Sequence, residues 1–336
     1  MTFKVKIILA ATLSFVSSVA FCQDAKELHE TAKAYMRQGD YANASLVLTH
    51  ALQLDPQNLE IAKDLALDYL FQKEGAKGIE VIKPLLEKDD ADDQMFQIGA
   101  SLYKSLDDVK EAEKVYKKGI KKFSSSGGLY NDYGETLWAQ GDLTAIKQWE
   151  RGIEKDPDFS GNYYNAARFY FFSKDKIWSI IYGEMFLNLE TFTTRTAEIK
   201  TILMENYKKL FSDPEFFKNT NDKSNFEQAF LSIMNKQMDI SENGINVESL
   251  TMIRARFILD WFDKYGKKYP FRLFEYQKQL LQDGLFEAYN QWIFGVVQNL
   301  QAYQNWTTSH SPEYTEFSKF QKNRMFKIPK GQFYHK

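Results

Sequence analysis

Apolar and polar positions follow a helical period along the chain, and the helices that they predict come in pairs. From Ala25 to about Leu189, apolar side chains recur at i, i+3, i+4 and i+7, which places them on one face of a helix. Each pair is joined by a short polar turn, and the unit repeats about every 34 residues. Small residues such as Ala32, Ala44 and Ala51 recur where the paired helices must approach closely. The pattern predicts about five stacked helical hairpins.

The first and fourth units carry the most complete form of the pattern. In both, a Gln-Gly-Asp turn is followed about one helix later by Asp-Pro, which ends the second helix. The spacing resembles the W-x2-L-G-x2-Y, A-x3-F, P pattern of tetratricopeptide repeats. The matching positions are Leu28, Ala32, Tyr35, Ala44, Leu48 and Pro56 in the first unit and Tyr130, Gly134, Leu137, Ala145, Trp149 and Pro157 in the fourth.

The other three units match this pattern less completely but stay in register. A bundle of helical hairpins without superhelical stacking is the alternative, but it would not require small residues at the same two places in each hairpin. The resemblance to tetratricopeptide proteins, here of an exported bacterial type, implies an all-α solenoid over residues 23–190.

A segment with the features of a secretory signal peptide precedes the repeats at residues 1–22. Lys4 and Lys6 come before an apolar run over 7–20, which is too short for a permanent membrane span. We expect cleavage after Cys22. The alternative is lipoprotein processing at Cys22, which the bulky Phe21 disfavours, and contact with a membrane is expected only in that case. The protein is therefore expected in the periplasm or outer envelope of a bacterium.

The composition of the chain argues against internal disulfides and against a nucleic-acid partner. Cys22 is the only cysteine, so the processed chain can form no internal disulfide. Loss of Lys4 and Lys6 takes the formal net charge from −2 to −4. A cluster of lysines over 110–122 is balanced by nearby acidic residues and is typical of a solvated helix face. Nucleic acid is therefore not an expected partner.

After about residue 190 the chain remains helical but loses the repeat. Helices are expected over 196–211, 223–240, 247–265, 273–303 with an interruption at Gly284, and 312–323. We expect this region, 191–323, to pack on the end of the array, because the last hairpin of a solenoid needs a cover. Arg254 lies on the apolar side of its helix and either pairs with a buried carboxylate or extends to the surface. Residues 324–336 are expected to form a loosely ordered tail.

The sequence offers few candidates for catalysis. His29, His50, His310 and His335 have no second metal ligand at a suitable spacing, and the Ser-Gly run at 124–128 lacks the lysine of a phosphate-binding loop. No carboxylate pair is singled out as an acid and a base. We therefore expect no metal, no cofactor and no enzymatic activity.

The resemblance also implies a binding site, because the first helix of each tetratricopeptide hairpin lines a concave groove. His29 and Lys33 stand where some family members have a lysine and asparagine clamp for a peptide carboxylate, so that binding mode is not expected. The positions carried over to this sequence are His29, Lys33, Met36, Lys63, Leu67, Leu70, Phe96, Tyr103, Asn131, Glu135, Trp138, Tyr164, Arg168, Phe171 and Phe172.

Aromatic rings and arginine in such a groove suit a peptide or protein ligand. The leading hypothesis is a non-enzymatic exported scaffold that helps to assemble or regulate a cell-envelope complex. Two alternatives are open at this point: a glycan-binding module, since flat rings stack on sugars, and an enzyme with an unrecognised site after Thr191.

Overall fold

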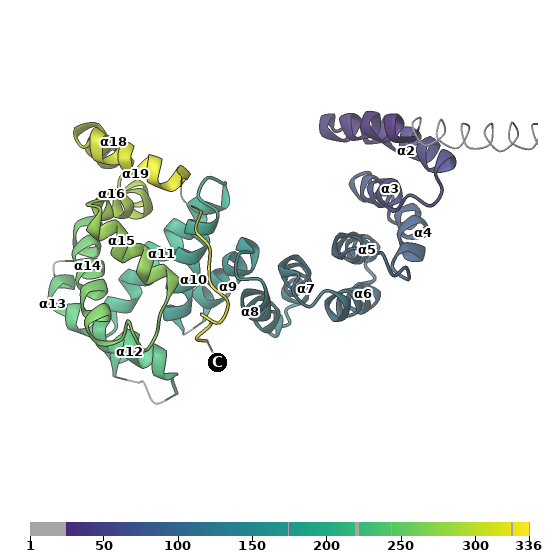
Figure 1. Cartoon of the computed structure of the whole chain (residues 1–336). Coiled ribbons are helices and arrows are strands. Elements are labelled where there is room, and N and C mark those ends of the chain that lie inside the picture. The colour runs from purple at the N-terminus through teal and green to yellow at the C-terminus, as the bar shows by residue number, and fades with distance from the viewer. Residues whose placement is uncertain (1–24, 174, 219–221, 243, 324, 336) are drawn as a thin grey trace, which may run out of the picture. The chain divides into compact units, whose positions relative to one another are not determined.

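The computed structural model describes residues 25–173, 175–218, 222–242, 244–323 and 325–335. Every regular element in these ranges is a helix (Figure 1). None of the described helices is both long enough and apolar enough to span a membrane. The predicted signal peptide at residues 1–22 lies outside the described residues. The chain divides into two compact units between Ser124 and Ser125, and each unit is described by itself below.

Three consecutive helical hairpins make up the first unit. In the first turn Gly39 has a φ of +77°, a conformation that glycine adopts at little cost. Asp40 follows and caps the next helix by accepting a hydrogen bond from the backbone N–H of Asn43 at 3.3 Å. The hairpins are residues 25–38 with α2 (Tyr41–Leu54), α3 (Leu59–Phe71) with α4 (Gly75–Leu85), and α5 (Asp93–Ser105) with α6 (Val109–Lys122).

Small side chains lie where the helices of this unit cross. Ala32, Ala44 and Ala51 are fully buried, as their recurrence in the sequence predicts. A side chain at Gly78 would overlap Leu102 of the neighbouring hairpin. Close packing of small residues therefore sets the distance between paired helices and between successive hairpins.

Two more hairpins begin the second unit. They are α7 (Gly127–Ala139) with α8 (Ala145–Lys155) and α9 (Ser160–Phe172) with α10 (Lys176–Leu189). α11 (Arg195–Ser212) packs against both α9 and α10. It therefore occupies the place of the first helix of a sixth hairpin, so the helical stacking continues one helix beyond the expected end of the array at residue 190.

The remaining helices form a carboxyl-terminal region that shares a core with α10 and α11. The predicted helix over 223–240 is divided into three elements, and the predicted helix over 273–303 is broken at Gly284, where φ is +71°, and again at Asn299, which caps the next helix. The elements are η1 (Pro214–Phe217), α12 (Asn225–Met234), η2 (Asn235–Gln237), α13 (Met238–Ser241), α14 (Val247–Lys264), α15 (Arg272–Gln282), α16 (Phe286–Asn290), η3 (Gln291–Gly295), α17 (Val296–Gln298), α18 (Leu300–Ser309) and α19 (Ser311–Asn323).

A buried ion pair joins α10 to this region. Arg254 on α14 donates hydrogen bonds to Glu184 on α10 and to Asn290 on α16. Glu184 also accepts hydrogen bonds from Gln277 Nε2 at 2.5 Å and from the Tyr289 hydroxyl at 2.9 Å. Burial alone would lower the pKa of Arg254, but Glu184, Tyr207 and Tyr289 together outweigh it and the pKa is raised. Of the two expectations for Arg254, the buried ion pair is the one observed.

These contacts explain where the two units divide. The expected domain boundary lies at residue 190, whereas the observed division falls between the third and fourth hairpins. The last two hairpins belong to the second unit because α10 contributes Glu184, Trp178 and other fully buried side chains to a core shared with the carboxyl-terminal helices.

The end of the chain differs from the loosely ordered tail expected over 324–336. The Tyr334 ring stacks on Phe226 with centroids 4.6 Å apart, and its hydroxyl donates to the carbonyl oxygen of Pro270. His335 Nδ1 lies 2.8 Å from a carboxylate oxygen of Glu150. In the described residues 325–335, the aromatic side chains of the tail therefore contact the apolar surface of the second unit.

Candidate functional site

The charged groove positions expected in the first unit are paired within that unit. His29 Nε2 lies 2.7 Å from Asp64 Oδ2, on the first helix of the next hairpin. Lys63 Nζ contacts Asp92 Oδ2 at 2.6 Å and Glu60 Oε1 at 2.9 Å. Burial would lower the pKa of Lys63, but the hydrogen bonds to the two carboxylates outweigh it and the pKa is raised. These side chains join neighbouring hairpins and are mostly buried.

The apolar groove positions of the first unit contribute mainly to packing. The Phe96 side chain is fully buried and meets the Phe123 ring edge-on, so its expected contact with a ligand is wrong. Met36 packs against the core of the first hairpins, and Lys33 pairs with Glu30 on its own helix. Leu67, Leu70 and Tyr103 are half-buried.

In the second unit, the expected positions on α7 and α9 come together with residues of α11 on one face. Asn131 and Asn165 occupy the same place in consecutive repeats, 34 residues apart, and Asn165 Nδ2 donates to Asn131 Oδ1 at 2.9 Å. The exposed Glu135 accepts hydrogen bonds from both asparagines, at 3.2 and 2.9 Å. We call Asn131, Glu135, Tyr164, Asn165, Arg168 and Glu198 the polar face.

Glu198 on α11 contacts two other members of the polar face. It accepts hydrogen bonds from the Tyr164 hydroxyl at 2.5 Å and from Arg168 Nε at 2.9 Å. Burial, and then the hydrogen bond to Glu198, raises the pKa of Tyr164. The Arg168 and Glu198 side chains are 38% and 44% exposed, so both are accessible to a ligand. The face is therefore held in a fixed geometry while its charges remain in contact with solvent.

Of the aromatic residues expected in the groove of this unit, some pack against other rings and others are exposed to solvent. The Trp138 ring lies against Phe169 and the buried Trp149, with centroids 5.2 and 5.9 Å away, and is half-buried. Phe171 is half-buried, whereas Phe172 is 73% exposed. Of these rings, Phe172 is the one most available to a partner.

Sequence reasoning missed two members of the polar face. Asn165 repeats Asn131 after 34 residues, and Glu198 follows Tyr164 by the same interval. A search for polar residues at the repeat spacing would have found both. Glu198 lies beyond residue 190, the expected end of the array, so the predicted groove did not include it.

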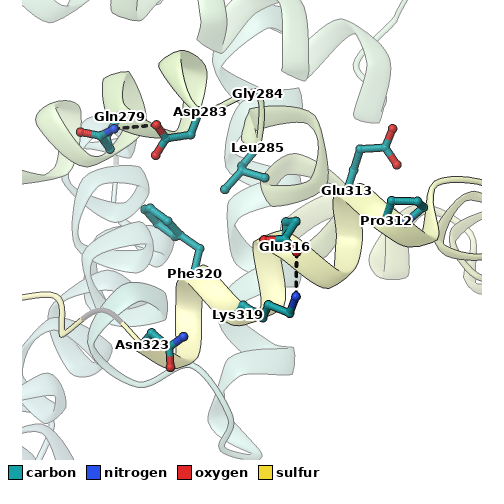
Figure 2. Close-up of a pocket in the computed structure, with 10 residues that line it drawn as sticks. All are labelled: Gln279, Asp283, Gly284, Leu285, Pro312, Glu313, Glu316, Lys319, Phe320 and Asn323. Carbon is teal, nitrogen blue, oxygen red and sulfur yellow. Dashed lines mark hydrogen bonds and ion pairs between the residues drawn. The ribbon is translucent and has the colours of Figure 1, made fainter.

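A separate open groove of about 960 Å³ lies between the carboxyl end of α15 and α19. Figure 2 shows its polar side chains around the apolar Leu285 and Phe320. Glu316 pairs with Lys319 at 2.8 Å, and Gln279 donates to Asp283 at 2.8 Å (Figure 2). These pairs satisfy much of the polar lining, and the groove contains none of the expected binding residues. Among the described residues, no group of three His, Cys, Asp or Glu side chains could hold a metal ion.

Comparisons with known proteins agree with the repeat geometry. Two tetratricopeptide repeat family models match the chain, one over residues 35–102 and the other over residues 95–121. No curated protein has a significant sequence match to this chain.

Several solved structures are similar over about half of the chain. A thermophilic tetratricopeptide protein of Thermus thermophilus is 15% identical, with 53% of this chain and 98% of that chain covered and a TM-score of 0.45. MamA is 20% identical, with 48% of this chain and 94% of that chain covered and a TM-score of 0.40. YrrB, described as a tetratricopeptide protein with an unusual peptide-binding site, is 16% identical, with 53% of this chain and 92% of that chain covered and a TM-score of 0.37.

The family assignment depends on the two family models, since all three TM-scores are below 0.5. The models match the second and third hairpins directly and part of the first. The hairpins of the second unit continue the same 34-residue spacing. Residues 35–121 therefore match tetratricopeptide repeats, and the helical hairpins of the second unit repeat at the same interval.

Proposed function

We propose that this protein is an exported, non-enzymatic scaffold that binds a protein or peptide partner on the polar face of α7, α9 and α11. Its role would be to assemble or regulate a complex of the bacterial cell envelope. The tetratricopeptide fold is a protein-interaction scaffold, which supports the general class. The observation that carries the proposal is the polar face itself, an ordered set of accessible charges on consecutive first helices.

The chemistry of the polar face suits an extended peptide segment. The Asn131 and Asn165 side chains are buried and bonded to each other and to Glu135, so they hold the Glu135 carboxylate in place, and the accessible groups of the face are its charged side chains. Glu135, bonded to the asparagine pair, presents a negative charge, and Arg168, paired with Glu198, presents a positive charge. A partner with complementary charges would gain specificity from these groups, and the exposed Phe172 would add apolar contact area.

Export and the envelope location are supported by the sequence of residues 1–22. Mass spectrometry of the protein isolated from the envelope fraction tests this part. We expect a mature chain that begins at Gln23. A chain that retains Met1 and remains in the cytoplasm would contradict export.

The absence of catalysis is proposed from the scarcity of histidine and cysteine in the sequence. A glycan-binding role is not proposed, because it depended on exposed aromatic rings. Phe96 is buried and Trp138 is half-buried against Trp149 and Phe169, which leaves Phe172 as the one well-exposed ring among the expected groove aromatics of these helices.

The binding site is tested by removing its charges while its shape is kept. In the double variant E135Q/R168Q, the hydrogen-bonding capacity at Glu135 is retained and one exposed ion pair is lost, which costs about 0–1 kcal/mol of stability. The matched control is R151Q/E154Q, with the same two changes at exposed positions on α8.

Both variants and the wild-type protein are used to capture partners from native envelope extract. We expect one protein that is retained by the wild type and by the control but lost from E135Q/R168Q. Equal retention by both variants would refute the polar face as the binding site. Retention of no protein by the wild type would refute the scaffold function in that extract.

A further inference from the structure

A second pocket with a different chemistry lies in the second unit, away from the polar residues described above. It has a volume of about 710 Å³ and is lined by described residues at the carboxyl end of α9, the start of α10, the carboxyl end of α11, in η1 and just before α12. Its lining residues are Ser173, Lys176, Lys209, Ser212, Asp213, Glu215, Phe216 and Lys223.

Lys176 enters this pocket from the first turn of α10. Its Nζ donates hydrogen bonds to the carbonyl oxygens of Phe171 and Ser173, at 2.6 and 2.5 Å. These carbonyls orient the ammonium group but carry no net charge, so the positive charge of Lys176 is not neutralised. Burial lowers the pKa of Lys176, and the nearby Lys209 lowers it further.

Lys209 approaches the same place from the last turn of α11. Its Nζ lies 4.4 Å from the centroid of the Phe171 ring, and the Nζ of Lys176 lies 5.6 Å from that centroid. Two ammonium groups thus share one aromatic ring. Among the described residues, neither lysine has a carboxylate partner within ion-pair distance.

Two of the other charged groups of the pocket form ion pairs. Lys223 Nζ lies 3.4 Å from Asp175 and 3.6 Å from Glu227, and Glu215 pairs with Lys218 at 2.6 Å. Asp213 accepts a hydrogen bond from the backbone N–H of Glu215 at 3.1 Å but forms no ion pair with another described residue. The unpaired charges of the pocket are therefore the two ammonium groups of Lys176 and Lys209 and the single carboxylate of Asp213, which leaves an excess of positive charge.

We propose that this pocket binds a compact oxyanion, a carboxylate or a phosphate group, between Lys176 and Lys209. An oxyanion there would replace the repulsion between the two ammonium groups by two charge-assisted hydrogen bonds. The Phe216 ring lines the pocket, and the Phe171 ring lies beneath the two ammonium groups, so apolar surface borders the proposed site. The site is independent of the polar face and does not depend on the function proposed above.

Titration of the full mature chain followed by NMR tests the site, with lysine side chains labelled at Cε. The probes are inorganic phosphate and the peptide tri-glutamate, each compared with chloride at matched ionic strength. The test variant is K209Q. The control is K208Q, which changes the neighbouring exposed lysine, itself paired with Glu205 at 3.0 Å.

We expect a saturable shift of the Lys176 and Lys209 signals with at least one probe, weakened about tenfold or more by K209Q and less than about twofold by K208Q. A response to phosphate identifies a small oxyanion as sufficient, and a response to tri-glutamate alone identifies an acidic peptide segment as the source of the anion. No saturable shift with either probe would overturn the proposal, since the two lysines would then serve only to stabilise the ends of α9 and α11. Equal weakening by K209Q and K208Q would overturn it as well.

Discussion

The buried pair of Glu184 and Arg254 provides a quantitative test of how the carboxyl-terminal region is attached to the repeats. Both side chains are almost fully buried, at 2% exposure each. The substitution E184Q removes the carboxylate while an oxygen acceptor remains for Gln277 and Tyr289. The substitution R254M removes the cation while an unbranched side chain of similar length remains.

The two substitutions should lower the free energy of unfolding by different amounts. Loss of one partner of a buried ion pair costs about 3–5 kcal/mol, because the other charge stays in a site of low dielectric constant. In E184Q the remaining guanidinium cannot release its proton. In R254M the remaining carboxylate can take up a proton and keeps its donors Gln277 and Tyr289. We therefore expect E184Q to be the more destabilising, and the double variant to cost less than the sum of the two single variants.

Urea unfolding followed by tryptophan fluorescence measures these differences. All six tryptophans of the chain follow residue 124, so the fluorescence reports on the second unit alone. With a slope of about 2 kcal/mol per molar urea, a loss of about 4 kcal/mol lowers the unfolding midpoint by about 2 M.

The reasoning about the pair is refuted if E184Q leaves the midpoint unchanged. It is also refuted if the two single effects add in the double variant, because a coupled pair should show an interaction energy of about 1–3 kcal/mol.

Three further predictions concern other parts of the molecule. Burial raises the pKa of Asp68 from 3.8 to about 6, so the folded state binds the carboxyl proton more tightly than the unfolded chain does. The free energy of unfolding should therefore fall as the pH rises from 3.8 to about 6. A carboxyl NMR titration of Asp68 with a midpoint near 4 would contradict this. The substitution G134A overlaps the Trp149 ring and should cost about 1–3 kcal/mol of stability, and an unchanged melting temperature would show that the ring can move freely. The substitution Y334A removes the ring stacked on Phe226 and should increase proteolysis of the tail, and cleavage at the wild-type rate would mean that the tail is not held by this contact.

The hairpins could be predicted because their signals are local. A turn such as Gly39-Asp40 combines a glycine at positive φ with a helix-capping carboxylate, and both effects act within a few residues. Buried small residues such as Ala32 and Ala51 recur because every hairpin must pack in the same way. The helix break at Gly284 was predicted for the same local reason.

The accessible part of the binding surface was harder to predict, because it depends on contacts between repeats. Sequence places His29 and Phe96 on the first helices of their hairpins, but it does not show that Asp64 pairs with the histidine or that Phe123 covers the phenylalanine. These contacts depend on the angle between successive hairpins, which the repeat pattern alone does not set.

The contacts of the tail were not predicted for a related reason. A short segment without periodicity next to the end of a chain usually lacks regular contacts. Here the segment is rich in aromatic residues, and Tyr334 and His335 find aromatic partners on helices far away in the sequence, Phe226 on α12 and Trp178 on α10. Composition alone does not show whether such partners are exposed to receive them.

Photo-crosslinking tests the central claim, that a partner binds on the face formed by α7, α9 and α11, most directly. A photoreactive phenylalanine analogue at Phe172, an exposed aromatic at the end of α9, is compared in intact cells with the same analogue at the exposed Leu143 before α8. The account predicts one crosslinked protein from position 172 and none of that size from position 143. The same product from both positions, or a product from position 143 alone, would contradict it.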